Sequence, residues 1–499
     1  MNRMLMIARN EGRLMRRNRV AQLAILMLLL LSVVATLTSV AHRDASDALR
    51  ARFQTQADRA FDGQPARHPH RMVHYGHFVF RPLPPLAAFD PGVDPFTGST
   101  IFLEGHRQNS ANFGDVRQSS LLARFGSLTP AFVLQVLAPL VLIFVGFGAV
   151  AREREQGTVR VLKAHGTSAT ALMAGKVLAL AAIAALMLLP ALLSLVWLVA
   201  IEGAAPAAAL ALGFGYAAYL LLWAVGIVAM SSMVGSARTA LMTLLGLWAF
   251  AIVLVPRVAP DMALSMVPSP TRLETDIAIH RDLRRIGDSH DPDDPHFKAF
   301  KAQVLDRYGV EKIEDLPVNY RGLLAMEGER LTSGLFDAYA RAQFEGERDQ
   351  GFHSDLQGTC ADSRARDQGR IVAAFGLISP TIALRSLSVA LAGTDLEAHR
   401  RFLQQAEAYR YKIVQQLNRL QAETVTYADD GSRNSDPEAG RRVRIDPRHW
   451  HDIPDFTYRG PSLRERLMAA GPGAAVLFFW SLLVGLVLGA AMRKLGRAY

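Results

Sequence analysis

The chain of 499 residues contains one cysteine, Cys360. A single thiol cannot form a disulfide within the chain or a thiolate zinc cluster, so packing alone must hold the polar regions together. A G-x-x-x-x-G-K-[ST] phosphate loop is also missing, which excludes nucleotide hydrolysis by that route. No basic stripe with interleaved aromatic residues is present, and this argues against nucleic acid as a partner.

Charge is scarce in the long apolar runs. Residues 132–150 and 177–200 carry none, and each run is long enough to cross about 30 Å of hydrocarbon as one helix. Apolar residues make up half of the chain and are clustered, as in an α-helical polytopic membrane protein. We expect six membrane spans, at residues 20–41, 130–150, 171–200, 207–230, 239–256 and 471–492.

The basic residues indicate how these spans are oriented. The segments expected in the cytoplasm, with the flanking Lys176, hold fifteen Lys or Arg and three acids, a net charge of +12 against +10 for the whole chain. The positive-inside rule therefore places both termini, 1–19 and 493–499, in the cytoplasm with segment 151–170. The run 20–41 is long for a signal peptide and predicts an uncleaved anchor, although Ser39-Val40-Ala41 resembles a cleavage site.

Two long polar segments are then expected outside the cytoplasm. Residues 42–129 are rich in Pro and Gly and predict a small insertion of mixed structure, whereas 257–467 predict a larger, mainly helical one. Within the larger insertion we expect a helix over 319–350 and a second, capped by Thr394-Asp395, running to Thr424. In that second helix a narrow packing seam is expected at Phe402, Ala406, Tyr409, Ile413, Gln416 and Leu420.

Residues 371–392 are apolar enough to suggest a seventh span. Pro380 and Arg385 lie near the middle of this run, and a seventh span would place the basic C-terminus outside. We therefore expect a helix that lies on the outer membrane surface.

The spans contain almost no ionisable residues, although ion-coupled carriers place such groups within the membrane. Gln135 is the most polar long side chain in a span, and an interhelical hydrogen bond is its simplest interpretation. A nucleophile beside a base at a span end is also missing, which argues against a membrane hydrolase. Energy for transport would have to come from a partner.

The connection between the second and third spans has its own local pattern. Gly157 and Gly166 interrupt it, and Thr158 can cap a short helix over Val159 to Ala164. Thr167 or Ser168 can cap the third span. The result would be a brief helix on the cytoplasmic surface, continuous with two spans, although a solvated basic loop would show the same composition.

The residues of this connection resemble those of a known family. Arg154-Glu-Gln-Gly-Thr158, Lys163-Ala-His-Gly-Thr-Ser168 and Gly175-Lys-Val177 resemble the signature of ABC type-2 transporter permeases. The resemblance implies that residues 1–19 form an elbow helix and that 151–170 hold the coupling helix, which docks on a separate ATPase. The implied coupling residues are Arg154, Glu155, Gln156, Gly157, Thr158, Val159, Val161, Leu162 and Lys163.

The same resemblance implies the partners of the chain. It would work as the permease of an ATP-driven exporter in the bacterial inner membrane, with ABC ATPase subunits, a second permease copy or homologue, and membrane lipid. ATP and Mg²⁺ would bind to the ATPase, and this chain would be neither an enzyme nor a cofactor carrier. Gly485 and Gly489 allow close helix packing, either within the chain or between permeases.

The insertions resemble an uncharacterised subgroup of these permeases with two large extracytoplasmic insertions. The residues that carry this resemblance include His77-Phe-Val-Phe80, Asp315-Leu-Pro-Val-Asn-Tyr-Arg-Gly322, Ala392-Gly-Thr-Asp395 and His449-Trp-His-Asp-Ile-Pro454. Such insertions suggest that the outer regions bind a substrate or an envelope protein. The alternative function is a membrane receptor or scaffold that binds an envelope partner or metal without ATP.

A cluster of histidines in the first insertion is a candidate metal site. The candidates are His68, His70, His74 and His77, of which the last three would share one face of a helix. Pro69 interrupts the cluster and Asp62 is the nearest acid, so surface histidines are the simpler interpretation. Glu104, His106 and Arg107 are interpreted as polar contacts in a turn.

Overall fold

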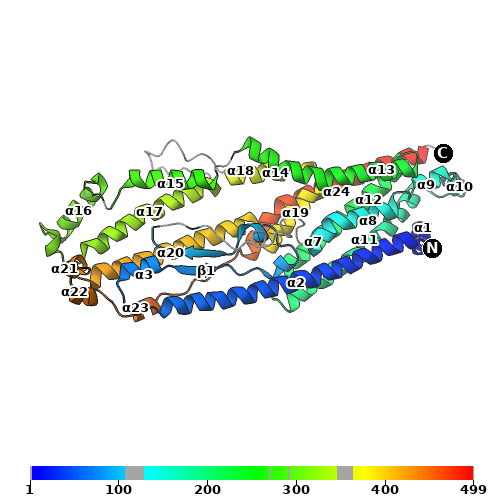
Figure 1. The fold of residues 1–499 in the computed structure, drawn as a ribbon. Helices are drawn as coiled ribbons and strands as arrows, with labels where there is room; N and C mark the ends of the chain where they lie inside the picture. The colour runs from blue at the N-terminus through cyan, green and yellow to red at the C-terminus, as the bar shows by residue number, and fades with distance from the viewer. Residues whose placement is uncertain are drawn as a thin grey trace.

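The computed structural model describes residues 3–106, 109, 128–268, 271–289, 291, 293–344 and 364–497. Arg107 and Cys360 therefore lie outside the described residues, as does the end of the helix expected over 319–350. The described chain is elongated (Figure 1). A helical bundle with both termini at its tip forms one half, and a polar, mainly helical domain forms the other.

The described residues contain six helices that are long and apolar enough to cross a membrane, as expected. They span Arg19–Asp62, Pro130–Glu155, Ala169–Ala200, Pro206–Met233, Ala237–Met266 and Leu463–Arg497. The elements of the bundle are α1 (Arg3–Arg17), α2 (Arg19–Asp62), α7 (Pro130–Phe132), η2 (Val133–Leu137), α8 (Ala138–Gly146), α9 (Ala151–Glu155), α10 (Thr158–Ala164), α11 (Ala169–Ala200), α12 (Pro206–Met233), α13 (Ala237–Trp248), η3 (Ala249–Leu254), α14 (Val255–Met266) and α24 (Leu463–Arg497). The core of the bundle is formed by buried apolar side chains from α8, α11 and α12. Between helices in a membrane such packing stabilises through van der Waals contact.

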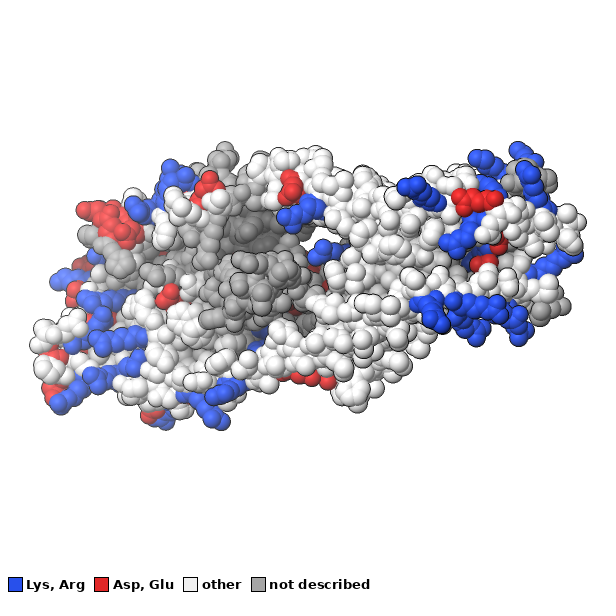
Figure 2. Space-filling model, turned by 45° about the vertical axis from the view of Figure 1, so that its right-hand side comes forward, with Lys and Arg blue, Asp and Glu red and all other residues white. Residues whose placement is uncertain are grey.

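Charged side chains divide the surface into zones. Figure 2 shows Lys and Arg gathered at the end that carries α9, α10 and both termini. A band nearly free of charge follows, and charges of both signs cover the opposite half. An uncharged band between two charged ends is the surface that a bilayer requires.

Helix α2 continues well beyond the expected span. Asn18 caps its start by accepting hydrogen bonds from the Val20 and Ala21 amides at 3.1 and 3.2 Å, and the helix ends only at Asp62. Residues 42–62 contain neither Gly nor Pro, so nothing in the sequence stops the helix before Gly63. The first insertion therefore begins as a helical stalk.

The other described elements of the first polar segment are α3 (Pro69–Tyr75), β1 (His77–Phe80), η1 (Pro85–Ala88), α4 (Asp94–Thr97) and β2 (Thr100–Leu103). Among these, β1 and η1 pack against the helical stalk. Strands β1 and β2 pair antiparallel, with His77 opposite Leu103 and Phe80 opposite Thr100. Val79, Ile101 and Leu103 are buried against Phe402.

The second polar segment is helical in its described part, with long helices that lie side by side. Its elements are α15 (Arg272–Ile286), α16 (Pro295–Tyr308), η4 (Ile313–Asp315), α17 (Tyr320–Phe344), α18 (Arg364–Ala374), η5 (Phe375–Leu377), α19 (Pro380–Ala392), α20 (Leu396–Thr424), α21 (Tyr427–Ser432), α22 (Pro437–Arg442) and α23 (Arg448–His451). Helix α17 packs along α20 (Figure 1). The predicted cap of α20 is confirmed, because the Asp395 carboxylate accepts a hydrogen bond from the Ala398 amide at 2.9 Å.

The prediction of a surface helix over 371–392 is wrong. The helical structure is interrupted before Pro380, where α19 begins. Helix α19 packs against both α12 and α24. Leu384, Leu387 and Leu391 are buried in the core of the bundle. The buried residues of α19 lie on nearly all sides of the helix. Packing between two long helices can cover all of these sides, whereas a position on the membrane surface would leave one side in water.

Candidate functional site

The connection between the second and third spans is a pair of short helices, α9 and α10, in the described structure. Gly157 separates them with φ of 73°, and Gly166 ends the second with φ of 76°. Both values lie in the left-handed region that glycine adopts without steric cost. Helix α10 begins at Thr158, one residue earlier than predicted, and the Ser168 hydroxyl caps α11 by accepting from the Ala171 amide at 3.1 Å.

Three side chains fix this pair of helices to neighbouring elements. Arg154 donates to the carbonyl of Ser232 at the end of α12 and to that of Val234 in the turn before α13, at 2.5 and 2.8 Å. The Glu155 carboxylate accepts from the Ala237 amide at 3.1 Å. At the other end of the pair, Lys163 donates to the carbonyls of Leu495 and Gly496 in α24, at 3.1 and 2.8 Å.

Helix α1 fixes the connection from a further side. The buried Lys176 ammonium lies 2.6 Å from a Glu11 carboxylate oxygen and 2.7 Å from one of Glu153, so a single cation joins α1, α9 and α11. Arg3 donates to the Gly166 carbonyl. A Cβ on Gly175 would lie 2.8 Å from the Met4 carbonyl oxygen, which shows how closely α1 approaches α11.

The outward face of α10 is available to a partner. Val159 is buried, whereas the side chain of Val161 is 56% exposed, and Gln156, Arg160 and His165 are exposed as well. The predicted coupling residues therefore divide into those that hold the segment, such as Arg154 and Val159, and those that face solvent. The predicted coupling set left out Arg160, which lies on α10, and His165, which follows its last residue, although both are exposed.

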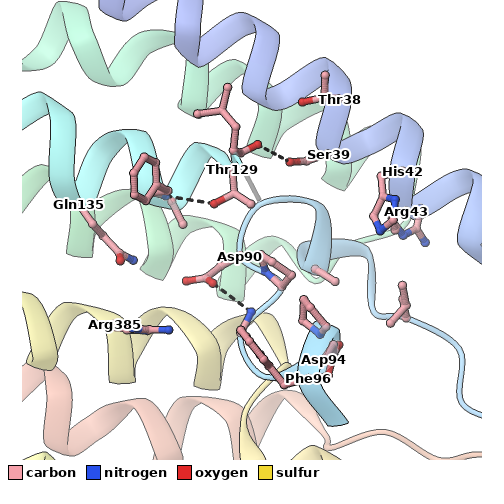
Figure 3. A pocket seen from close by; sticks show the side chains of 18 of the residues that line it. Thr38, Ser39, His42, Arg43, Asp90, Asp94, Phe96, Thr129, Gln135 and Arg385 are labelled. Atoms are coloured by element: carbon pink, nitrogen blue, oxygen red, sulfur yellow. Dashed lines mark hydrogen bonds between the residues drawn. The ribbon is translucent and has the colours of Figure 1, made fainter. Parts of the chain in front are cut away.

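A cavity of about 680 Å³ lies where the bundle meets the polar domain. Figure 3 shows Gln135 and Arg385 on two helices at one side of it, Asp90 on the loop next to them, and Arg43 on α2 at the other side. Phe96, Phe132 and Ile252 supply apolar lining. A lining of apolar side chains with a few polar groups suits an amphipathic molecule.

Two prolines shape the helices beside this cavity. Pro139 and Pro256 have no N–H, and each follows a π-helical turn, η2 or η3. The Gln135 carbonyl, which would otherwise bond to residue 139, accepts from the Tyr219 hydroxyl at 3.0 Å. The turn thus places Gln135 and Val136 in the cavity wall without leaving this buried carbonyl unpaired.

A chain of hydrogen bonds connects the bundle to the first polar segment. The Gln135 amide donates to the Tyr216 hydroxyl at 2.7 Å, which confirms the predicted interhelical bond. The Tyr216 hydroxyl lies 3.0 Å from that of Ser388, which donates to the Asp90 carboxylate at 2.5 Å. Burial raises the pKa of Asp90, although its hydrogen bond from Ser388 opposes this. This series of hydrogen bonds therefore joins η2, α12 and α19 to the loop after η1.

The structure brings two of the four predicted histidines together. His70 and His74 lie on α3, and their Nε2 atoms are 3.2 Å apart. Pro69, which was expected to interrupt the cluster, occupies the first turn of α3, where a missing N–H costs nothing. The shared face expected for His77 is wrong, because α3 ends at Tyr75 and His77 turns away to Asp58 at 3.1 Å.

His68 lies outside the histidine cluster, and His106 is its third member. The His68 Nδ1 atom caps α3 by accepting from the His70 amide at 3.1 Å, and its Nε2 atom lies 3.2 Å from Asp430. The ligand atoms of His70, His74 and His106 all lie within 4.8 Å of one another. The sequence did not indicate this grouping, because β-strand pairing brings His106 to α3.

These features define a helical polytopic membrane protein with a fixed connection at one end and a large polar domain at the other. A family model described as "ABC-2 family transporter protein" matches residues 5–283, more than half of the chain. The chain therefore belongs to the ABC-2 transporter family and is a membrane permease of an ABC system. A second model, "Domain of unknown function (DUF3526)", matches residues 272–459 in the second polar segment. No curated protein matches the chain.

Proposed function

We propose that this chain is the transmembrane subunit of an ATP-driven exporter and that its α10 receives the force of a separate ATPase. The observation that carries this proposal is the exposed face of α10 on a segment fixed to α1, α12, α13 and α24. A helix held on several sides moves together with the spans it joins, so force applied at Val161 would reach α8 and α11. ATP and Mg²⁺ bind to the ATPase.

The basic end of the molecule faces the cytoplasm in this proposal. The positive-inside rule supports this orientation, since Lys and Arg gather beside α9, α10 and the termini (Figure 2). The polar half then lies outside the cytoplasm, and the membrane is a bacterial inner membrane. Two permease copies or homologues pair within it.

Two routes would carry movement from the membrane to the outer domain. Helix α2 runs from the bundle into the domain without a break. The hydrogen-bonded chain from Gln135 to Asp90 joins the second span to the loop after η1. The cavity beside this chain would hold an amphipathic substrate, or would change shape as the outer domain acts on an envelope partner.

The docking of an ATPase can be tested by one substitution on α10. Val161→Glu places a charge on an apolar side chain that is 56% exposed, so it should spare the fold and disrupt an apolar contact. We expect wild type, purified in mild detergent from cells that also express its ATPase, to retain that subunit. The variant should retain at least about tenfold less, which corresponds to about 1.4 kcal/mol of lost contact.

Leu273→Glu is the matched control, because Leu273 is 69% exposed and lies on α15 in the polar domain. It should retain as much ATPase as wild type, and all three proteins should unfold at the same temperature. If Val161→Glu retains as much ATPase as wild type, α10 is not part of the interface with the ATPase. Failure of wild type to retain any ATPase would favour a receptor or scaffold that works without ATP.

A further inference from the structure

Helix α3 presents two imidazoles at the spacing of a metal site. His70 and His74 are four residues apart and therefore lie one above the other on the same face of the helix. Their Nε2 atoms are 3.2 Å apart. Two nitrogens bound to one tetrahedral Zn²⁺ at 2.0–2.1 Å would be separated by about 3.3 Å, whereas neighbouring ligands of a square-planar ion at that distance would be about 2.9 Å apart.

His106 completes the cluster from the turn after β2. Its backbone has φ of 61°, a left-handed conformation that is uncommon outside glycine and tends to occur at functional sites. The rings of His70 and His74 lie 5.8 and 5.4 Å from the His106 ring, centroid to centroid. The three imidazoles therefore converge from two separate elements.

A buried carboxylate orients His106. The Nδ1 atom and the backbone amide of His106 lie 3.4 and 3.3 Å from the same Glu329 oxygen. A proton on Nδ1 that points to Glu329 leaves Nε2 as the ligand atom, and metal-binding histidines usually have such an outer partner. Glu329 is fully buried and is in turn paired with Arg410 at 2.6 Å.

The cluster is only partly enclosed by the described chain. His70 is half-buried. His74 and His106 are exposed, which leaves one side of the cluster open to an entering ion.

We propose that His70, His74 and His106 bind one Zn²⁺ ion through three imidazole nitrogens, with a fourth position open to water or to another ligand. The separation of the two α3 nitrogens favours Zn²⁺ over a square-planar ion. The ion would tie α3 to the turn after β2, and Glu329 would extend this connection to α17 in the second polar segment. The proposal does not depend on coupling to an ATPase.

Zinc binding can be measured on the full-length protein in detergent, carrying no histidine tag. We expect wild type to take one equivalent of Zn²⁺ from a chromogenic chelator. Co²⁺ in its place should give the intense visible absorption of a tetrahedral site. The variants His74→Gln and His106→Asn should each lose affinity by more than the roughly 10- to 100-fold that loss of an outer partner costs. Asparagine keeps the left-handed backbone accessible at position 106.

Two further variants distinguish a built site from scattered histidines. Glu329→Gln should weaken Zn²⁺ binding by roughly 10- to 100-fold through the orientation of His106. His280→Ala removes an exposed histidine of α15 and should bind as wild type does. If His74→Gln and His106→Asn, folded as judged by thermal unfolding, bind Zn²⁺ as tightly as wild type, the site does not exist. Absence of one tight equivalent in wild type would overturn the proposal equally.

Discussion

A few charged residues at the end of the bundle are buried and paired. The sequence pattern predicts only on which side of the membrane such residues lie, not that they pair. In the sequence, Lys176 is one of many basic residues near the segments expected in the cytoplasm, yet its side chain is 2% exposed and lies between Glu11 and Glu153. The positive-inside rule predicts basic residues at such an end. Its pairing depends on where α1 packs, which no local pattern of the sequence gives.

Replacement of Lys176 by Met should destabilise the protein. The change leaves two largely buried carboxylates without a cation, and the removal of one partner of a buried pair costs about 3 kcal/mol. We expect a lower midpoint of thermal unfolding in detergent. Lys163→Met is the control, because Lys163 is only partly buried and its loss should cost less than about 1 kcal/mol.

A triple variant provides the counter-test for this ion cluster. Lys176→Met combined with Glu11→Gln and Glu153→Gln removes the uncompensated charge, so most of the lost stability should return. If Lys176→Met alone unfolds at the wild-type temperature, the cluster does not hold α1 on α11.

The histidines show what residue spacing can and cannot predict. His70 and His74 meet because they are four residues apart on one helix, a local relation that the sequence contains. His77 was expected with them but follows Gly76, whose φ of 73° turns the chain into β1. His106 joins them only through the register of β1 and β2, which is a non-local pairing.

At the scale of elements, periodicity predicted the helices well and their packing less well. The seam expected on α20 is too narrow, since Gln416 is exposed while Leu417 and Asn418 are buried. Helix α20 packs against α17 and also against α3, so two faces are covered instead of one stripe. A sequence shows that a helix is amphipathic, but it does not show how many neighbours the helix has.

The contact between α19 and α24 depends on a glycine. A Cβ at Gly473 would lie 2.7 Å from the Ala383 carbonyl oxygen and 3.0 Å from the Leu387 amide nitrogen. Gly473→Val should therefore force the helices apart and destabilise the protein by about 1–3 kcal/mol, the usual cost of overpacking. The measurement is thermal unfolding of the purified chain.

Gly471 offers a matched control two residues away on the same helix. A Cβ at Gly471 meets no atom of the described chain within 4 Å. Gly471→Val should leave the unfolding temperature unchanged or slightly raised, because Val is a better helix former than Gly. Equal effects of the two substitutions would show that helix propensity, not the α19 contact, governs the result.

At the scale of the whole molecule, the apolar runs of the sequence predict how many helices can span the membrane. They do not predict what contacts the surfaces of these helices that face away from the bundle. Only 11% of the apolar window of α24 is buried within the described chain, and 17% of that of α2. Gly485 and Gly489 were expected to pack either within the chain or between permeases. Packing within the described chain is not observed, because a Cβ at either glycine meets no described atom within 4 Å. The other alternative, contact between permeases, stays a prediction.

The double substitution Gly485→Val and Gly489→Val tests this prediction. The two glycines are one turn apart on an exposed apolar helix, an arrangement that lets two membrane helices approach closely. Added side chains should keep the helices apart and reduce the dimer fraction, measured by native mass spectrometry or by light scattering of the detergent-purified protein. The thermal midpoint of the monomer should not fall, because no contact within the described chain is altered, and Gly471→Val should dimerise as wild type does. An undiminished dimer would exclude this face of α24 and direct attention to α2, the other span whose surface the described chain leaves largely uncovered.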